Sequence, residues 1–280
     1  MPEQKLSSCT ATKKIHMPAT HAKKNLTSYA APALEKGLDI LEFLANAPAA
    51  QTQQQIAGAL GRSVSELFRM LDVLERRGFI ARDAASASYR LTLRLFELAH
   101  REPSTRRLLD AALPLMDALA QSTGQSNHLV VHYTDRIVVV GQTDSPGDMG
   151  FSVKLGAHFP FRADRVSVRV LTAFQTPERR AALIDLMISN DPAPPSAATL
   201  SRHIGTIARQ GYEERISDTL PGITDICFPV FDASGAAVAT LTQPFLKQRE
   251  MKMSIAAARR THAETAARLS QKLGFGEMPT

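Results

Sequence analysis

Apolar residues recur at steps of three and four between Thr52 and Ile80, which is the spacing of helices with one buried side. In the second half of this stretch the apolar side consists of Val64, Leu67, Phe68, Leu71 and Leu74. Side chains at this spacing lie on one face of a helix, so we expect all five to face a core.

Two capping sequences divide this stretch into two helices. Thr52–Gln55 and Ser63–Glu66 both fit the capping box, in which a hydroxyl and a Gln or Glu side chain three residues later bond to unpaired backbone groups. Residues 59–62 lie between the two and include Gly61, which suits a tight turn. The pattern therefore predicts a helix-turn-helix.

Short strands are predicted directly after the second helix. Gly78 can end that helix in a left-handed conformation. Residues 79–82 and 89–91 then resemble strands around a small polar tip at residues 83–88. A further helix is predicted upstream, where apolar residues keep a helical spacing from Pro32 to Asn46. Together these elements predict a winged helix-turn-helix domain over residues 29–91.

After Gly124 the apolar pattern changes from helical to alternating. Hairpins are predicted over residues 128–142 and 226–242, with another strand over 151–155. Helices are predicted over residues 104–122, 166–174, 177–187, 200–210 and 247–273. Pro114 falls inside the first of these and is expected to kink or split it. Hairpins separated by helices indicate an α+β domain over residues 105–280, joined to the winged helix by a helical connector over residues 92–104.

The polar side of the second helix has the chemistry of a nucleic-acid reader. It carries Arg62, Ser65, Glu66, Arg69 and Arg76. Guanidinium groups near the start of such a helix can pair with guanine edges in the major groove. Two alternatives stay open: an ordinary amphipathic helix whose charges are merely solvated, and a protein that keeps the fold without binding DNA.

Composition indicates where the protein acts and what kind of partner it has, but it does not indicate a reaction. The chain has 280 residues, 44% of them apolar, a formal net charge of +6 and a pI near 9.5, which fits a polyanionic partner. Its lysine-rich start predicts a disordered basic arm over residues 1–28. Two distant cysteines, Cys9 and Cys227, and no apolar run of roughly 18 residues indicate a cytoplasmic protein without a membrane span.

No metal, cofactor or catalytic site is predicted. His128 and His132 lie four apart on a strand, but no third ligand has suitable spacing, so packing or hydrogen bonding explains them better. The chain contains no nucleophile elbow, Gly-rich phosphate loop or paired carboxylate motif, which argues against an enzyme. A hydrolase using Ser or Cys with His remains the alternative.

Several local sequences, in the right order, resemble the IclR family of bacterial transcriptional regulators. They include ALEKGLDILEFL, LGRSVSELFRMLDVLERRGFI, YRLTLRLFELA and PGITDICFPVFDASGAAVATLT, within residues 32–273. The resemblance implies a dimeric or tetrameric DNA-binding regulator whose C-terminal GAF-like domain holds a small-molecule effector. It also implies that positions of the recognition helix contact DNA bases, and that positions at the helix start and in the wing contact the DNA backbone. These residues are Arg62, Ser63, Ser65, Glu66 and Arg69, together with Gln53, Arg82 and Arg90.

The resemblance further implies an effector pocket between residues 156–164 and the last hairpin. Its residues here are Gly156, Arg162, Ala163, Asp164, Arg215, Asp225, Thr240 and Thr242. Where the family has small residues after a Pro-Leu-like pair, this chain has bulk and charge in Pro160–Ser167, and Arg215 replaces a common acidic residue. The pocket is therefore either reshaped or without a ligand.

Arginine side chains in this region favour an acidic effector. Arg162, Arg165 and Arg215 could hold a carboxylate by paired hydrogen bonds. Alternatively, these arginines pair with Asp164, Glu213 and Glu214 as solvated charges. The DNA partner expected for a two-fold dimer is a pseudo-palindromic duplex that presents successive major grooves about 34–36 Å apart.

Overall fold

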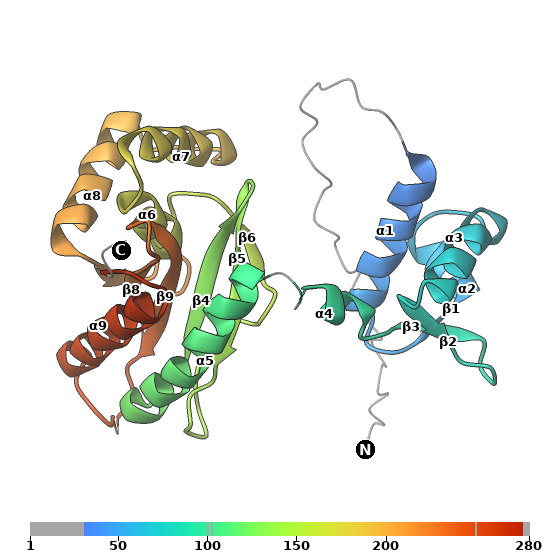
Figure 1. Ribbon diagram of the computed structural model, residues 1–280, viewed down its shortest axis with the longest axis horizontal. Coiled ribbons are helices and arrows are strands. Elements are labelled where there is room, and N and C mark those ends of the chain that lie inside the picture. The colour runs from blue at the N-terminus through green and yellow to red at the C-terminus, as the bar shows by residue number, and fades with distance from the viewer. Residues whose placement is uncertain (1–30, 100, 102, 250, 277–280) are drawn as a thin grey trace, which may run out of the picture. The chain divides into compact units, whose positions relative to one another are not determined.

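The computed structural model describes residues 31–99, 101, 103–249 and 251–276 (Figure 1). The chain divides into two compact units between Phe96 and Glu97, within the segment predicted as a connector. We call them the winged-helix unit and the α+β unit. The arm predicted over residues 1–28 lies outside the described residues.

The winged-helix unit contains three helices and a small antiparallel sheet among its described residues. Its elements are α1 (Pro32–Asn46), β1 (Gln51–Thr52), α2 (Gln53–Ala59), α3 (Val64–Arg76), β2 (Ile80–Arg82) and β3 (Ser88–Leu91). The strand order is β1-β3-β2. The predicted helix-turn-helix and wing are confirmed, whereas β1, only two residues long, was not predicted from the sequence.

A single small core holds the winged-helix unit together. Ile40 of α1, Ile56 of α2 and Leu67 and Leu71 of α3 are buried together with Tyr89 of β3. Burial of these apolar side chains stabilises the unit, and the core is small because a unit of this size can bury few residues.

The expectation that all five apolar residues of α3 face this core is wrong. Val64 and Phe68 are 41% and 60% exposed, while Leu67 and Leu71 are buried. Helix α3 packs on α1 and α2 along a narrow line. The residues on either side of that line therefore remain in solvent.

The α+β unit is built on one six-stranded antiparallel sheet with the order β6-β5-β4-β9-β8-β7. Its strands are β4 (Asn127–Tyr133), β5 (Arg136–Thr143), β6 (His158–Pro160), β7 (Glu213–Ile216), β8 (Ile223–Phe231) and β9 (Ala237–Leu246). Its helices are α5 (Pro103–Thr123), α6 (Val166–Ala173), α7 (Pro177–Asn190), α8 (Ala197–Gln210) and α9 (Ile255–Lys272). A short helix, α4 (Arg94–Ala99), spans the division between the units.

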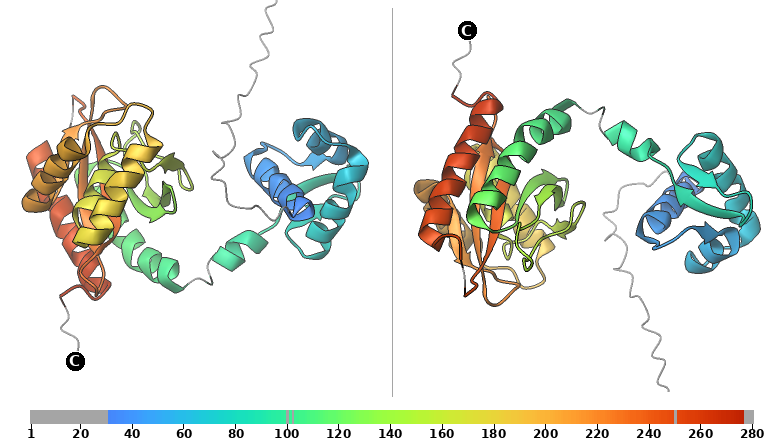
Figure 2. Two further views of the ribbon diagram at one scale, coloured as in Figure 1. Left: turned by 90° about the horizontal axis from the view of Figure 1, so that it is seen from above. Right: turned by 90° about the horizontal axis from the view of Figure 1, so that it is seen from below.

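Helices cover both faces of this sheet. Helices α5 and α9 lie side by side on one face, as Figures 1 and 2 show, and enclose a core that includes Met116 and Leu241. The opposite face carries α6, with α7 and α8 packed against it, over a core that includes Phe161 and Val168. This second face also bears buried polar residues, among them Ser167 and Thr242.

Several predicted elements of the α+β unit differ from the observed ones. The strand expected at residues 151–155 does not form; β6 pairs with β5 instead, through His158–Pro160. Strand β7 was not predicted, and α9 begins at Ile255 rather than near 247, because Ser254 caps the helix there. Pro114 does not split α5; it lies on the exposed side, where the carbonyl that loses its helical partner can bind water.

Among the described residues, no helix combines the length and apolar character that crossing a bilayer requires.

Candidate nucleic-acid interface and effector site

Both predicted caps form at the helix starts, one completely and one by half. The Gln55 amide donates to the Thr52 hydroxyl at 3.3 Å, and the Thr52 amide donates to the Gln55 side chain at 2.8 Å. At α3 the Glu66 amide donates to the Ser63 hydroxyl at 3.3 Å, but the Glu66 carboxylate turns to another partner. The caps set where α2 and α3 begin.

That other partner is Lys36 of α1. The Lys36 ammonium lies 2.5 Å from the Glu66 carboxylate, and the hydrogen bond between them is the largest cause that lowers the pKa of Glu66. Arg62 contacts Asp39 of α1 at 3.1 Å and Glu66 at 3.7 Å. Two of the predicted DNA contacts, Arg62 and Glu66, therefore hold α1 against the start of α3.

Gln53 also has a structural partner. Its side-chain amide donates to the Val64 carbonyl at 3.1 Å, which ties the start of α2 to the start of α3. Ser63 and Ser65 are exposed, and their hydroxyls lie 3.2 Å apart. These residues shape the turn that presents α3.

Arg69, a predicted DNA-reading residue, is free to contact DNA bases. Its side chain is exposed one turn beyond Ser65 and forms no ion pair with another described residue. Ser65, Glu66 and Arg69 share one stripe of α3, and Arg62 lies just before the helix. Arg69 therefore projects from a stripe whose first turn is fixed by caps and ion pairs.

The wing carries two more exposed cations. Arg82 lies over the Tyr89 ring at 5.8 Å, and Arg90 is exposed on β3. The wing tip is ordered by Asp83, whose carboxylate accepts hydrogen bonds from the Ala85 and Ser86 amides at 3.1 and 2.8 Å. These bonds fix the hairpin from which both arginines extend.

In the α+β unit, a row of polar residues crosses the sheet face under α6. His128, Thr242, Cys227 and Glu213 stand opposite one another on β4, β9, β8 and β7. Directly paired residues of antiparallel strands share a face, so all four point to the same side. The Ser167 hydroxyl of α6 lies 3.0 Å from that of Thr242, which places α6 above the row.

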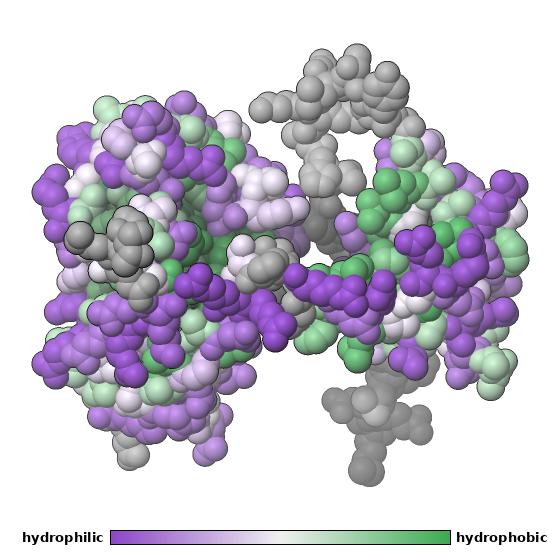
Figure 3. Space-filling view, in the orientation of Figure 1, coloured by the Kyte–Doolittle hydropathy of each residue, from purple (hydrophilic) through white to green (hydrophobic). Residues whose placement is uncertain are grey.

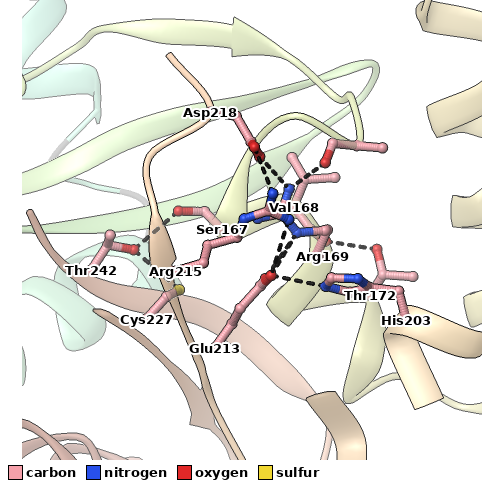
Figure 4. Close-up of polar contacts among 11 residues, drawn as sticks. Ser167, Val168, Arg169, Thr172, His203, Glu213, Arg215, Asp218, Cys227 and Thr242 are labelled. Carbon is pink, nitrogen blue, oxygen red and sulfur yellow. Dashed lines mark hydrogen bonds and ion pairs between the residues drawn. The ribbon is translucent and has the colours of Figure 1, made fainter. Parts of the chain in front are cut away.

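Arg169 is the centre of this region, as Figure 4 shows. The residue is 3% exposed, and its Nε donates to both Glu213 oxygens at 3.0 and 2.9 Å. Its Nη1 donates to the Ala163 carbonyl and, at 3.1 Å, to Asp218. His203 Nε2 lies 2.9 Å from Glu213. A buried guanidinium is tolerated here because carboxylates and a carbonyl surround it.

The predicted effector residues are only partly brought together. Thr240 and Thr242 are buried on the α6 face of the sheet. Asp225 is half-buried near Arg169, and burial is the main cause that raises its pKa. Gly156 instead lies in an exposed turn beside β5, where its amide donates to the Val139 carbonyl.

All three arginines proposed to hold a carboxylate already have carboxylate partners. Arg162 lies 3.6 Å from Asp164 and 3.7 Å from Asp191, and Arg165 lies 3.7 Å from Asp164. Arg215 contacts Asp218 at 2.7 Å and Glu213 at 3.8 Å. These contacts agree with the alternative that the three arginines pair with carboxylates of the chain itself. Its third partner is wrong, because Glu214 contacts Arg259 at 2.9 Å.

A surface hollow of about 450 Å³ opens at the β7 edge of the sheet, lined by α8 and β7. It reaches Glu213 and Arg215, so solvent approaches the Arg169 cluster from that edge. Neither this hollow nor a second one beside Arg106 is lined by Thr240, Thr242 or Asp225. Phe161 is fully buried in the core where an open pocket was expected.

Arg169, Ser167 and Asp218 were not identified from the sequence as site residues. One signal was present: Arg169 is the charged residue of the otherwise neutral run VSVRVLTA. A helix that is apolar nearly all round is buried, and a cation within it needs a counter-ion. The sequence could not show which carboxylates supply that charge.

The two histidines of β4 have different surroundings. His132 contacts the Thr134 carbonyl at 2.8 Å and Arg179 at 3.3 Å, and its ring packs on Phe161. His128 is buried, and no described residue forms a hydrogen bond with its Nδ1. No metal-binding group of three or more His, Cys, Asp or Glu side chains occurs in the described part of the chain.

Acidification is expected to destabilise the α+β unit through buried histidines. Burial lowers the pKa of His128 to about 4 and that of His262 to about 3. Below pH 6.5 the unfolded chain binds protons that the folded chain excludes, so stability falls as the pH drops toward these values. The loss approaches about 1.4 kcal/mol per pH unit for each histidine.

Urea unfolding of the wild type and of His128→Asn and His262→Asn variants at pH 7.5, 6.5 and 5.5 tests this expectation. Each variant should lose less stability on acidification than the wild type. Equal pH dependence in all three proteins would contradict the assignment to these histidines.

Family models match a region in each of the two units. The IclR helix-turn-helix domain matches residues 33–84, and the bacterial transcriptional regulator IclR C-terminal domain matches residues 102–271. The glycerol operon regulatory protein of Streptomyces coelicolor is 25% identical over 250 residues, 87% of this chain and 97% of that protein. The transcriptional regulator KdgR of Escherichia coli is 27% identical over 222 residues, 78% of this chain and 83% of that protein.

Solved structures share the fold at 22% identity. The IclR of Thermotoga maritima aligns with a TM-score of 0.70 over 86% of this chain and 98% of its own. An IclR homolog of Microbacterium hydrocarbonoxydans, in complex with 4-hydroxybenzoate, aligns with a TM-score of 0.71 over 86% of this chain and 99% of its own. Because the C-terminal model alone covers more than half of the residues, this chain belongs to the IclR family of bacterial transcriptional regulators.

Proposed function

We propose that this regulator reads a specific DNA duplex through α3. The observation that carries the proposal is the exposed Arg69, presented by a helix whose start is fixed by Ser63, Gln53 and the Lys36–Glu66 ion pair. A guanidinium in this position can pair with both acceptors of a guanine. Arg82 and Arg90 of the wing are proposed to contact phosphates, which positions α3 without specifying sequence.

We propose that the regulator binds its operator as a homodimer or homotetramer. Apolar side chains are exposed on α1, where Leu34 and Leu38 are 63% and 50% exposed, and at α4, where Leu98 is 40% exposed. Figure 3 shows an apolar surface over α1. Contact between copies would remove it from water, and a two-fold pair would read two half-sites of a pseudo-palindrome about 34–36 Å apart.

The effector is proposed to be a small organic acid that binds the α+β unit. The guanidinium groups of Arg169 and Arg215 supply the charge for it, and the Microbacterium protein with 4-hydroxybenzoate supports the chemical class. A second candidate, regulation without any ligand, is favoured by the buried Phe161 and by the internal pairing of the arginines.

A panel of small carboxylates separates these two candidates. An acid effector should raise the melting temperature of the protein and change its affinity for the operator. If no acid in the panel changes either quantity, the ligand-free candidate stands.

We propose further that the protein acts in the cytoplasm and is not an enzyme. Burial raises the pKa of the Cys227 thiol to about 12, so the thiol stays protonated and is a poor nucleophile. The Ser167 hydroxyl is buried against Thr242 and forms no hydrogen bond with a histidine among the described residues. Turnover of esters or amides by the purified protein would contradict this view.

Arg69→Ala is expected to weaken operator binding by about 1–3 kcal/mol, or roughly 5- to 150-fold. The variant loses a hydrogen-bonded guanine contact, so it should also stop discriminating at one base position. The operator can first be selected from random duplexes with the wild-type protein. Fluorescence anisotropy then gives the affinities of the wild type and the variant for that duplex and for its single-base changes.

Arg209→Ala is the matched control for this experiment. Arg209 is an exposed arginine of α8, so its removal lowers the net charge equally without touching the winged-helix unit. The control should bind like the wild type. If Arg69→Ala also binds every duplex like the wild type, α3 does not read DNA through this residue.

A further inference from the structure

Asp218 bridges two guanidinium groups in the α+β unit. One carboxylate oxygen lies 3.1 Å from Arg169 Nη1, and the other lies 2.7 Å from Arg215 Nη2 (Figure 4). This is how the carboxylate of a bound acid would contact the same two arginines. The position that suits an acidic ligand is thus filled by the chain itself.

The two carboxylates of the cluster are held very differently. Glu213 belongs to β7, is 5% exposed, and bonds to Arg169 through both oxygens. Asp218 belongs to the segment 217–222 between β7 and β8, and residues 218–222 are exposed. Glu213 is therefore a fixed counter-ion of Arg169, whereas Asp218 can leave without unpacking the core.

The ends of this segment are anchored independently of Asp218. The Ser217 amide donates to the Ile223 carbonyl at 2.9 Å, and the Ile223 amide donates to the Leu220 carbonyl at 3.2 Å. Gly222 has a φ of +90°, a conformation that glycine adopts without strain. Because the β7–β8 pairing extends from Glu213 to Ile216, it does not depend on where the Asp218 side chain lies.

Unused hydrogen-bonding groups on the same face of the sheet point to a ligand. The Thr240 hydroxyl and His128 Nδ1 are both buried, and neither bonds to a nitrogen or oxygen atom of a described residue; the Thr240 hydroxyl is left with the weakly bonding Cys227 thiol. Thr240 and Thr242 are two apart on β9 and so lie on one face, with His128 directly opposite Thr242. Buried polar groups without partners are uncommon, and a ligand with polar groups would satisfy them.

We propose that Asp218 is an internal substitute for the effector carboxylate. In the free protein it occupies Arg169 and Arg215; an acidic effector displaces it and takes both guanidinium groups. The inference rests on the proposed effector-binding function and adds its regulation. Displacement weakens the apparent affinity, because the effector must compete with Asp218. It also releases the segment 217–222, which gives the liganded and free states different structures.

Removal of the internal carboxylate should create a site that acetate can fill. The experiment uses the full-length Asp218→Ala variant and measures its melting temperature in sodium acetate and, at equal ionic strength, in sodium chloride. The variant should melt below the wild type, and acetate should restore the difference with a saturable dependence on concentration. The wild type should require at least tenfold more acetate for any comparable effect.

Asp110→Ala is the matched control. Asp110 also pairs with an arginine, Arg106, at 3.5 Å, but both side chains are largely exposed. Acetate should not stabilise this variant saturably. Equal rescue of both variants, or no rescue of Asp218→Ala, would overturn the proposal.

Asp218→Asn covers the case in which the alanine variant does not fold. Asparagine keeps the size of the side chain and removes its charge, so this variant should bind acetate at least tenfold more tightly than the wild type. Equal acetate affinity in the two proteins would overturn the inference. Operator binding is measured separately. A wild type that selects no operator would contradict the proposed function. Intact operator binding without acetate rescue would contradict only the proposed role of Asp218.

Discussion

Arg169→Met is expected to lower the free energy of unfolding of the α+β unit by about 3–5 kcal/mol. The variant leaves the 5%-exposed Glu213 without the guanidinium that bonds to both of its oxygens, and a buried carboxylate without that partner is strongly destabilising. Urea unfolding measures the loss. Hydrogen exchange followed by mass spectrometry locates it, because faster exchange should be confined to peptides of the α+β unit.

Two comparison proteins show whether the loss comes from the unpaired charge. The double variant Arg169→Met with Glu213→Met should regain much of the stability, because apolar residues of similar volume often replace a buried ion pair without penalty. Arg209→Ala, which removes an exposed arginine from α8, should unfold like the wild type. If Arg169→Met loses less than about 1 kcal/mol, the ion pair is not the buried, well-bonded pair seen in the structure.

Leu67→Ala is expected to destabilise the winged-helix unit by about 2–5 kcal/mol. Leu67 is fully buried between α1 and α2 in a core of few residues, so the lost methyl groups leave a cavity that the small unit cannot easily fill. A loss of this size approaches the whole stability of such a domain. Operator binding should fall with it, while hydrogen exchange in the α+β unit stays unchanged.

Phe68→Ala is the matched control on the same helix. Phe68 is adjacent to Leu67 but 60% exposed, so its truncation should change the stability of the winged-helix unit by no more than about 0.5 kcal/mol. Urea unfolding of both variants makes the comparison. Equal losses would mean that α3 is buried on both sides, which would leave no surface for a DNA groove.

These stability predictions also bear on regulation. An effector can act only if it binds more tightly to one arrangement of the regulator than to another. The Arg169 cluster offers such a difference, because Glu213 is fixed in β7 and Asp218 lies on a separate exposed segment. The proposed competition between Asp218 and an acid would convert a local exchange of carboxylates into a changed loop.

The order of elements was predictable because it depends on short-range patterns. Helical spacing and the Thr52 cap located α1, α2 and α3, and alternating residues located the two main hairpins. The motifs that resembled the IclR family led to the family that both domain models match. Predictions of strands failed where a strand forms only through its pairing partner. Residues 151–155 were predicted as a strand, but β5 pairs with His158–Pro160 instead.

The candidate sites depend on contacts between residues far apart in the chain. The sequence placed Arg62, Glu66 and Arg69 on one stripe, but only the fold assigned the first two to α1 and left Arg69 available. Likewise, the apolar run around Arg169 indicated burial, whereas its counter-ions, Glu213 and Asp218, come from 44 and 49 residues away. Spacing along a chain determines which side of a helix a residue occupies. Which charge meets it there is decided by tertiary packing, because a buried ion must find its partner in space.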